Sequence, residues 1–248
     1  MFPMLYYREL LTTDRDAYGI YVQSPFPKEN RRILIGSDVS SRYTRRNRAE
    51  YRKIAGYIAR CVWQRQGNYM VFFPSYRLME DVLQVYEEEF SVDWVRCVCQ
   101  TPDMTEQERE GFLEEFQERE GTLVGFCVLG GIFSEGVDLT GESLIGAVIV
   151  GTGLPQIGSQ REILKEYYDK KNHCGFDYAY RYPGMNKVLQ AAGRVIRTKE
   201  DKGVILLLDD RFWDRDYQEI FPREWQDRTG CRLDTVEDAV ETFWKRFT

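Results

Sequence analysis

A chain of 248 residues with 43% hydrophobic and 14% aromatic side chains is long enough to bury the core of one large α/β domain. No apolar run approaches the roughly 20 residues of a membrane span. Charged residues interrupt the N-terminal stretch, so neither a membrane protein nor a secretory signal is predicted. The net charge of −6 argues against binding nucleic acid by bulk charge alone, although a local cationic groove is compatible with it.

Apolar runs alternate with amphipathic stretches along the chain, which predicts a mostly parallel sheet with crossover helices. Strands are expected at Tyr18–Val22, Ile33–Ile35, Tyr69–Phe73, Trp94–Cys99, Thr122–Leu129, Ser143–Val150 and Val204–Leu208. Helices are expected near 45–65, 76–89, 105–119 and 159–170, and two or three short helices close the chain, the last around Val236–Phe247. We interpret residues 1–248 as one domain without internal repeats.

Six basic residues crowd the start of the first long predicted helix: Arg42, Arg45, Arg46, Arg48, Arg52 and Lys53. A solvated helix start explains such a run, and so does part of a surface that faces nucleic acid. The sequence alone leaves both interpretations open.

The segment Gly67-Asn-Tyr-Met-Val-Phe-Phe-Pro-Ser-Tyr-Arg77 predicts a strand that ends where Pro74-Ser75-Tyr76 opens a helix. Ser75 suits an N-cap, because its hydroxyl can accept from a backbone N–H of the first turn. The same helix start can offer N–H groups and a hydroxyl to a nucleic-acid phosphate. Tyr76 or Arg77 suits stacking on, or contact with, a single strand, and ordinary packing or solvation explains each equally well.

A glycine-rich loop, Gly130-Gly-Ile-Phe-Ser-Glu-Gly-Val-Asp-Leu-Thr-Gly141, follows a predicted strand and so lies at the carboxyl edge of the sheet, where α/β proteins place ligand loops. Its polar groups are Ser134, Glu135 and Asp138. One hypothesis makes Glu135 and Asp138 the acid/base pair of a stand-alone hydrolase, although no accompanying nucleophile or metal ligands are recognised. Another takes the segment as a glycine-rich connection with solvated carboxylates.

The most informative segment is Gln190-Ala-Ala-Gly-Arg-Val-Ile-Arg197. Wound as a helix at about 100° per residue, it places Gln190, Arg194 and Arg197 within roughly 60° of one another, opposite an apolar face. We therefore expect both arginines on an exposed face, where two guanidiniums would suit a phosphate. An amphipathic helix with solvated arginines is the alternative.

These motifs carry a resemblance to a known family. The segment from Gln190 to Arg197 resembles motif VI of superfamily-2 helicases, in the form typical of the DinG/XPD group of DNA helicases. Ser134-Glu-Gly-Val-Asp138 resembles motif V of that group, and the segment from Gly67 to Arg77 resembles motif IV. The resemblance implies a three-layer RecA-like fold of the P-loop NTPase type. It also implies that Arg194 and Arg197 stabilise charge on the transferred γ-phosphate.

The same resemblance implies further site residues. It places Gln190, Gly136 and Asp138 near the nucleotide and Ser134 near the DNA backbone, while Ser75 and Tyr76 belong to the motif IV stretch. It implies ATP as the substrate, single-stranded DNA as a partner and 5′→3′ polarity. The competing hypothesis is a non-catalytic interaction module with a degenerate helicase fold, for which retention of both arginines would be unnecessary.

The chain has no Gly-x-x-x-x-Gly-Lys-Ser/Thr loop, the element that cradles the β- and γ-phosphates and helps to place Mg²⁺. It therefore resembles the second of the two helicase lobes, and its start at Phe2–Tyr7 is similar to the sequence that follows the last motif of the first lobe. We expect a piece of a longer polypeptide whose N-terminal lobe supplies the phosphate loop and most Mg²⁺ contacts. Where the family carries an iron–sulfur cluster, the cluster lies in that lobe.

The cysteines agree with this expectation. Six are scattered without a Cys-x-x-Cys pair, and the chain has one histidine, so the sequence lacks the ligand spacing of a zinc or iron–sulfur site. Free thiols are typical of reducing compartments, and we expect a cytoplasmic protein.

Overall fold

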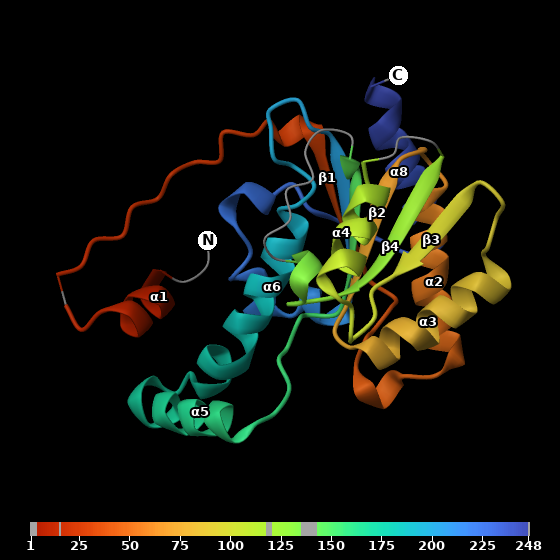
Figure 1. The fold of residues 1–248 in the computed structure, drawn as a ribbon. Coiled ribbons are helices and arrows are strands. Elements are labelled where there is room, and N and C mark those ends of the chain that lie inside the picture. The colour runs from red at the N-terminus through yellow and green to blue at the C-terminus, as the bar shows by residue number, and fades with distance from the viewer. Residues whose placement is uncertain (1–3, 15, 118–120, 135–142, 248) are drawn as a thin grey trace.

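A parallel sheet forms the centre of the computed structural model, which describes residues 4–14, 16–117, 121–134 and 143–247 (Figure 1). Within this part of the chain the sheet has seven strands in the order β3-β4-β2-β5-β6-β1-β7, and every neighbouring pair is parallel. The strands are β1 (Arg31–Gly36), β2 (Asn68–Phe73), β3 (Val95–Cys99), β4 (Thr122–Val128), β5 (Gly146–Val150), β6 (Gly203–Leu208) and β7 (Thr229–Cys231). The predicted parallel α/β architecture is confirmed.

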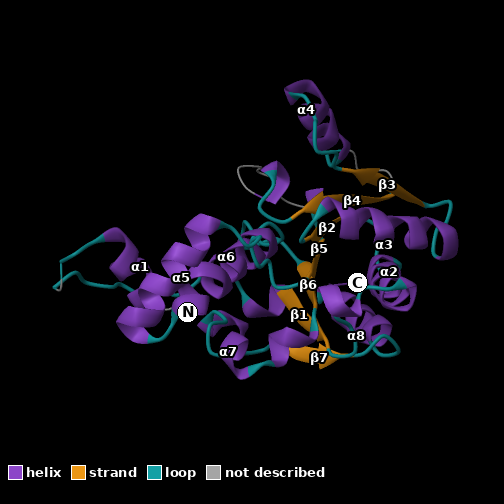
Figure 2. Ribbon diagram, turned by 90° about the horizontal axis from the view of Figure 1, so that it is seen from below, coloured by secondary structure: helices purple, strands orange, loops and turns teal. Residues whose placement is uncertain are grey.

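Helices cover both faces of the sheet, which gives three layers (Figure 2). Helices α2 (Arg48–Val62), α3 (Tyr76–Glu89) and α8 (Val236–Trp244) lie on one face, and α6 (Tyr182–Ala192) and α7 (Arg215–Gln218) lie on the other. The remaining helices are α1 (Met4–Leu11), α4 (Glu106–Glu115) and α5 (Ser159–Asn172). The predicted helices near 45–65, 76–89, 105–119 and 159–170 therefore correspond to α2, α3, α4 and α5.

The central strands are apolar throughout because both of their faces are covered. In β6, Val204, Leu206 and Leu208 pack into the core beneath α2, α3 and α8. Their neighbours Ile205 and Leu207 point to the opposite core, beneath α6. This two-sided burial is why the sequence shows a continuous apolar run there instead of an alternating one.

Helix starts carry the side chains that satisfy their first backbone N–H groups. The Asn47 side chain accepts from Glu50 N at 3.1 Å ahead of α2. Thr105 and Glu108 form a reciprocal capping box at α4. These local signals explain why the helix starts were predictable from the sequence.

The elements differ from the sequence-based expectations at one predicted strand and at two unpredicted elements. Tyr18–Val22 forms no strand, and Tyr18 is 97% exposed, because the alternating apolar residues there meet no partner strand. The edge strand β7 has three residues, too few for a recognisable pattern. A π-helical turn at Asp177–Arg181, which the sequence did not predict, continues into α6, and Tyr178 and Tyr180 are buried.

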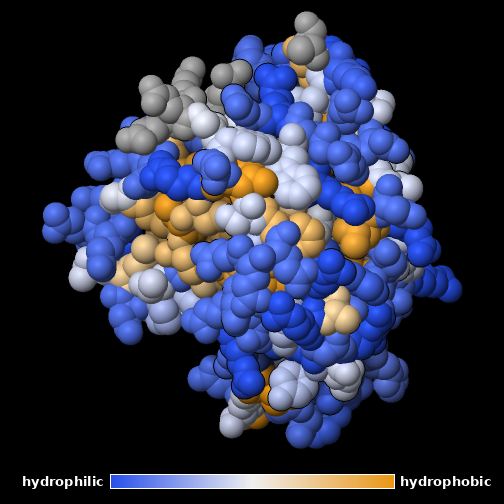
Figure 3. Space-filling model, turned by 90° about the vertical axis from the view of Figure 1, so that its right-hand side faces the viewer, coloured by the Kyte–Doolittle hydropathy of each residue, from blue (hydrophilic) through white to orange (hydrophobic). Residues whose placement is uncertain are grey.

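The side of the molecule that carries β3 is mostly hydrophilic, with an apolar area bordered by polar side chains (Figure 3). Strand β3 lies at the edge of the sheet, and its residues are only partly buried. In the described part of the chain, no helix is both long and apolar enough to cross a membrane.

Candidate functional site at the carboxyl edge of the sheet

Loops that follow parallel strands meet at the carboxyl edge of the sheet. Gly151, directly after β5, has a φ of +82°, and a Cβ at this position would lie 2.5 Å from Ser41 Oγ and 3.7 Å from Pro74 Cγ. The loops that follow β1, β2 and β5 therefore come together at one point. Glycine is required there, both for the backbone conformation and for the close approach of Ser41.

Ser75 occupies the N-cap of α3, as the sequence predicted. Its backbone is extended, and its Oγ accepts from Leu78 N at 3.4 Å. The side chain is half-buried, and the next residue but one, Arg77, is exposed. The N-cap role is thus confirmed, while a phosphate contact at this helix start stays a prediction.

Tyr76 is held between the core and a polar partner. Its ring packs against the core beneath α2 and α3, and its hydroxyl accepts from Gln100 Nε2 at 3.0 Å. Burial has the largest effect on the Tyr76 hydroxyl and raises its pKa above the ordinary value. Packing and this hydrogen bond account for the orientation of the ring, and a contact with DNA remains a prediction.

The glycine-rich loop begins after β4 and turns through a short 3-10 helix, Ile132–Ser134. Gly130 has a φ of +73°, and a Cβ there would lie 2.9 Å from Nζ of Lys187, which belongs to α6. The 3-10 helix also contacts α6. The predicted site residues Gly136 and Asp138, and Glu135 of the hydrolase hypothesis, lie outside the described residues.

The predicted helical geometry of the arginine segment is wrong. Helix α6 ends at Ala192, with Gly193 as its C-cap, so Arg194 and Arg197 follow the helix instead of continuing its polar face. Beyond the helix, Asp201 accepts from Arg197 N and Thr198 N, both at 2.7 Å, which turns the chain toward β6. The carboxylate thus replaces the helical hydrogen bonds that the periodic pattern suggested.

Burial separates the two arginines as well. Arg194 is only 5% exposed, whereas Arg197 and the predicted nucleotide-binding residue Gln190 are exposed. The expectation that both guanidiniums lie on one open face is therefore incorrect for Arg194. In the turn after Ala192, Arg194 directly precedes Val195 and Ile196, both of which are buried in the core beneath α6.

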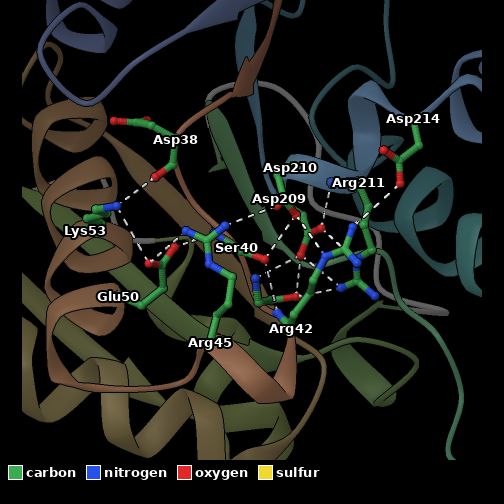
Figure 4. A network of polar contacts seen from close by, with 11 residues as sticks. Asp38, Ser40, Arg42, Arg45, Glu50, Lys53, Asp209, Asp210, Arg211 and Asp214 are labelled. Atoms are coloured by element: carbon green, nitrogen blue, oxygen red, sulfur yellow. Dashed lines mark hydrogen bonds and ion pairs between the residues drawn. The ribbon is translucent and has the colours of Figure 1, made fainter.

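Beside these loops lies a polar network that the sequence did not predict (Figure 4). Asp209, fully buried after β6, accepts from Ser41 Oγ at 2.6 Å and Ser41 N at 2.9 Å. Its two carboxylate oxygens also accept from Arg211, from Nε at 2.7 Å and Nη2 at 2.9 Å. Burial opposes ionisation of Asp209, but the hydrogen bonds and charge of Arg211 and the bonds from Ser41 outweigh it and lower the pKa of Asp209.

The network extends to the basic run before α2. Arg42 and Arg45 both pair with Asp210, at 3.4 and 3.3 Å, and Arg45 and Lys53 pair with Glu50 (Figure 4). Further along α2, Arg48 pairs with Glu88 and Glu89, and Arg52 pairs with Glu89. Carboxylates therefore compensate most of this run, which favours a helix start over a surface that faces nucleic acid, although the charges are paired instead of merely solvated. The only advance signal for the network was the pair Asp209-Asp210 directly after a buried strand.

Comparison with known proteins places this geometry in context. A family model described as the helicase C-terminal domain matches residues 58–228. The chain is 30% identical over 189 residues to the ATP-dependent DNA helicase XPD of Sulfolobus acidocaldarius, covering 72% of this chain and 31% of that protein. It is 29% identical over 206 residues to a probable ATP-dependent helicase of Methanocaldococcus jannaschii, covering 79% of this chain and 31% of that protein.

A regulator of telomere elongation helicase 1 homolog of Drosophila melanogaster is 29% identical over 218 residues, which cover 80% of this chain and 21% of that protein. Among solved structures, an XPD helicase aligns with a TM-score of 0.64 at 24% identity, over 81% of this chain and 35% of that chain. The likeness in structure supports the RecA-like helicase fold. The chain spans about a third or less of the length of these curated relatives.

Proposed function

The chain belongs to the helicase C-terminal domain family, and on that premise we propose that it is the second motor lobe of an ATP-dependent DNA helicase that moves 5′→3′ on single-stranded DNA. The N-terminal lobe of the same polypeptide completes the motor, and ATP binds between the two lobes. The protein works in the cytoplasm.

The contact between α6 and the start of the glycine-rich loop is the observation that supports this proposal best. The segment that resembles motif VI begins on α6, and the segment that resembles motif V begins at Ser134. More than 50 residues separate the two segments along the chain. The 3-10 helix Ile132–Ser134 contacts α6, and Gly130 lies against Lys187 of that helix. The start of the glycine-rich loop and the helix that carries Gln190 are thus neighbours in the fold.

In the proposed site, Gln190 near the end of α6 and Arg197 in the turn that follows the helix face the nucleotide, and Arg194 acts with Arg197 on the transferred phosphate. Guanidiniums stabilise the charge that spreads over the γ-phosphoryl oxygens in the transition state. Gly136 and Asp138 complete the nucleotide contacts. Mg²⁺ would neutralise charge between the β- and γ-phosphates. Because the phosphate loop that helps to place Mg²⁺ is not in this chain, we assign most of its ligands to the other lobe.

Single-stranded DNA is proposed to cross the carboxyl edge at the start of α3, with contacts from Ser75, Tyr76 and Ser134. The acidic balance of the chain predicts that this contact is local and involves few phosphates. Binding of an oligonucleotide should therefore weaken steeply with salt, with a slope that corresponds to only a few released counterions. A salt-independent affinity would contradict the assignment.

The test uses a two-lobe polypeptide with a phosphate-binding loop upstream of this chain. We expect ATP hydrolysis stimulated by single-stranded DNA, and we expect Arg197→Ala to lower turnover by about 10³–10⁵-fold. Affinity for ATP should change far less, because the effect belongs to the transition state. Arg215→Ala is the matched control, since the Arg215 side chain is exposed and forms a surface pair with Glu219.

The competing interaction module makes the opposite prediction for this experiment. If the chain were a non-catalytic module, Arg197→Ala would lower the turnover of the two-lobe polypeptide no more than Arg215→Ala does, apart from any effect of lost folding. Measuring the melting temperature beside turnover separates the two hypotheses. Any test of Arg194 needs the same measurement of melting temperature, because Arg194 is buried and a buried arginine can be retained for stability alone.

A further inference from the structure

Gln100 joins three loops at the carboxyl edge. It follows β3 directly and is 4% exposed. Its Nε2 donates to the Tyr76 hydroxyl at 3.0 Å, and its Oε1 accepts from Val128 N at 3.0 Å. Its own backbone N donates to Phe126 O at 2.8 Å. One side chain thus connects the start of α3 with the residue from which the glycine-rich loop leaves β4.

The sheet explains why a glutamine is suited to this position. Strand β4 lies between β3 and β2, and β3 ends at Cys99, whose partner is Phe126. Val128 therefore extends past the last pair of the β3–β4 ladder, and its N–H has no acceptor from β3. The amide of Gln100 supplies that acceptor and, with its other end, reaches over β4 to Tyr76.

The contacts continue beyond Val128 toward α6. Val128 O accepts from Gly131 N at 3.1 Å, and Gly130 lies against Lys187 of α6. Lys187 is three residues before Gln190, which places the two side chains on neighbouring positions of the helix surface. The path from the start of α3 to α6 therefore consists of direct contacts between packed groups.

We propose that Gln100 is a positioning residue that couples nucleic-acid contact at the Ser75–Tyr76 helix start to the loop beginning at Val128. This inference rests on the proposed function, and it adds the side chain through which the DNA-contacting segment and the nucleotide-facing segment act on each other. Gln100 contacts neither DNA nor nucleotide in this role. It holds the hydroxyl of Tyr76 and the backbone of Val128 in a fixed relation.

Amide hydrogen exchange on the 248-residue chain tests the link without reference to any activity. Gln100→Met removes both hydrogen bonds at similar volume, Tyr76→Phe removes only one, and Gln84→Met is the matched control on the exposed face of α3. We expect Gln100→Met to speed exchange of the Val128 amide about 10-fold or more. Tyr76→Phe should speed exchange of the Val128 and Gly131 amides less than Gln100→Met does. In a protein that already carries Gln100→Met, Tyr76→Phe should have no further effect on these amides. Additive effects of the two substitutions would overturn the link.

The functional arm uses the two-lobe polypeptide and measures hydrolysis with and without single-stranded DNA. Gln100→Met should reduce the stimulation by DNA about 10-fold. Basal turnover should fall far less than 10-fold, and the melting temperature should show that the variant is still folded under the assay conditions. Tyr76→Phe, which leaves Val128 satisfied, should reduce the stimulation in the same direction. Gln84→Met should match the parent.

The outcomes separate the two ideas. A parent protein without DNA-stimulated hydrolysis would contradict the proposed function and the coupling role with it, whereas the exchange experiment would still decide the link between Tyr76 and Val128. A stimulated parent whose Gln100→Met variant is stimulated equally would refute the coupling role alone. Equal losses of basal and stimulated turnover would show that Gln100 only supports folding.

Discussion

Removing the guanidinium of Arg211 should destabilise the fold strongly, because it leaves the Asp209 carboxylate buried without its main partner. The Asp209 side chain is 0% exposed and that of Arg211 is 18% exposed. Arg211→Met keeps most of the packed volume and removes the bonds from Nε and Nη2. Breaking a buried pair by deleting one partner costs about 3–5 kcal/mol in the free energy of unfolding. For a chain of this size that corresponds to a melting temperature lower by roughly 10 °C.

The pH dependence follows from the lowered pKa of Asp209. A carboxylate whose folded pKa lies below its unfolded value contributes stability above the unfolded pKa of about 3.9. That contribution is lost as the pH falls through the folded pKa. In Arg211→Met, burial acts on Asp209 without the compensating charge and raises its pKa. The difference in stability between parent and variant should thus be largest near neutral pH and shrink toward acid pH.

Urea unfolding followed by tryptophan fluorescence at several pH values measures these differences. Arg215→Met is the control, because its side chain is 88% exposed and its pair with Glu219 should contribute under about 1 kcal/mol. Asp209→Asn combined with Arg211→Met should recover part of the loss, since the amide carries no buried charge. A loss for Arg211→Met no larger than that of the control, or one independent of pH, would refute the account of the network.

Three further predictions concern other parts of the chain. Arg194→Ala should lower the free energy of unfolding by about 1–3 kcal/mol, whereas Arg197→Ala should lower it by about 0–1 kcal/mol. The reason is that, of these two arginines, only Arg194 is buried. Equal losses in urea unfolding would contradict the assigned burial. The 248-residue chain by itself should release phosphate from ATP only at background rate, because it has no Gly-x-x-x-x-Gly-Lys-Ser/Thr loop; robust Mg²⁺-dependent turnover would refute the two-lobe proposal. Burial raises the pKa of Cys61 to about 12, so this thiol should resist alkylation at pH 8 until the protein unfolds, whereas half-buried Cys174 should react earlier; mass spectrometry of a labelling time course would show the order.

The sequence by itself determined the class of fold and most of its elements. Continuous apolar runs such as Val204–Leu208 indicate strands buried on both faces, and helical periodicity with a cap such as Ser75 marks a helix start. Both signals are local: they depend on the spacing of residues along a few turns or one strand. The motif segments were recognisable for the same reason, since each is a short run of residues.

Only the tertiary structure decided which side chains meet. Ser41 and Asp209 are 168 residues apart and form a buried hydrogen bond because β1 and β6 are neighbours in the sheet. Gln100 follows β3 and Tyr76 follows β2, and the two side chains meet because only β4 separates these strands in the sheet. The periodic pattern likewise extended α6 through Arg197, whereas Asp201 accepts from the backbone and turns the chain after Ala192. Strand order and these long-range partners arise from the packing of the whole sheet, which no local pattern contains.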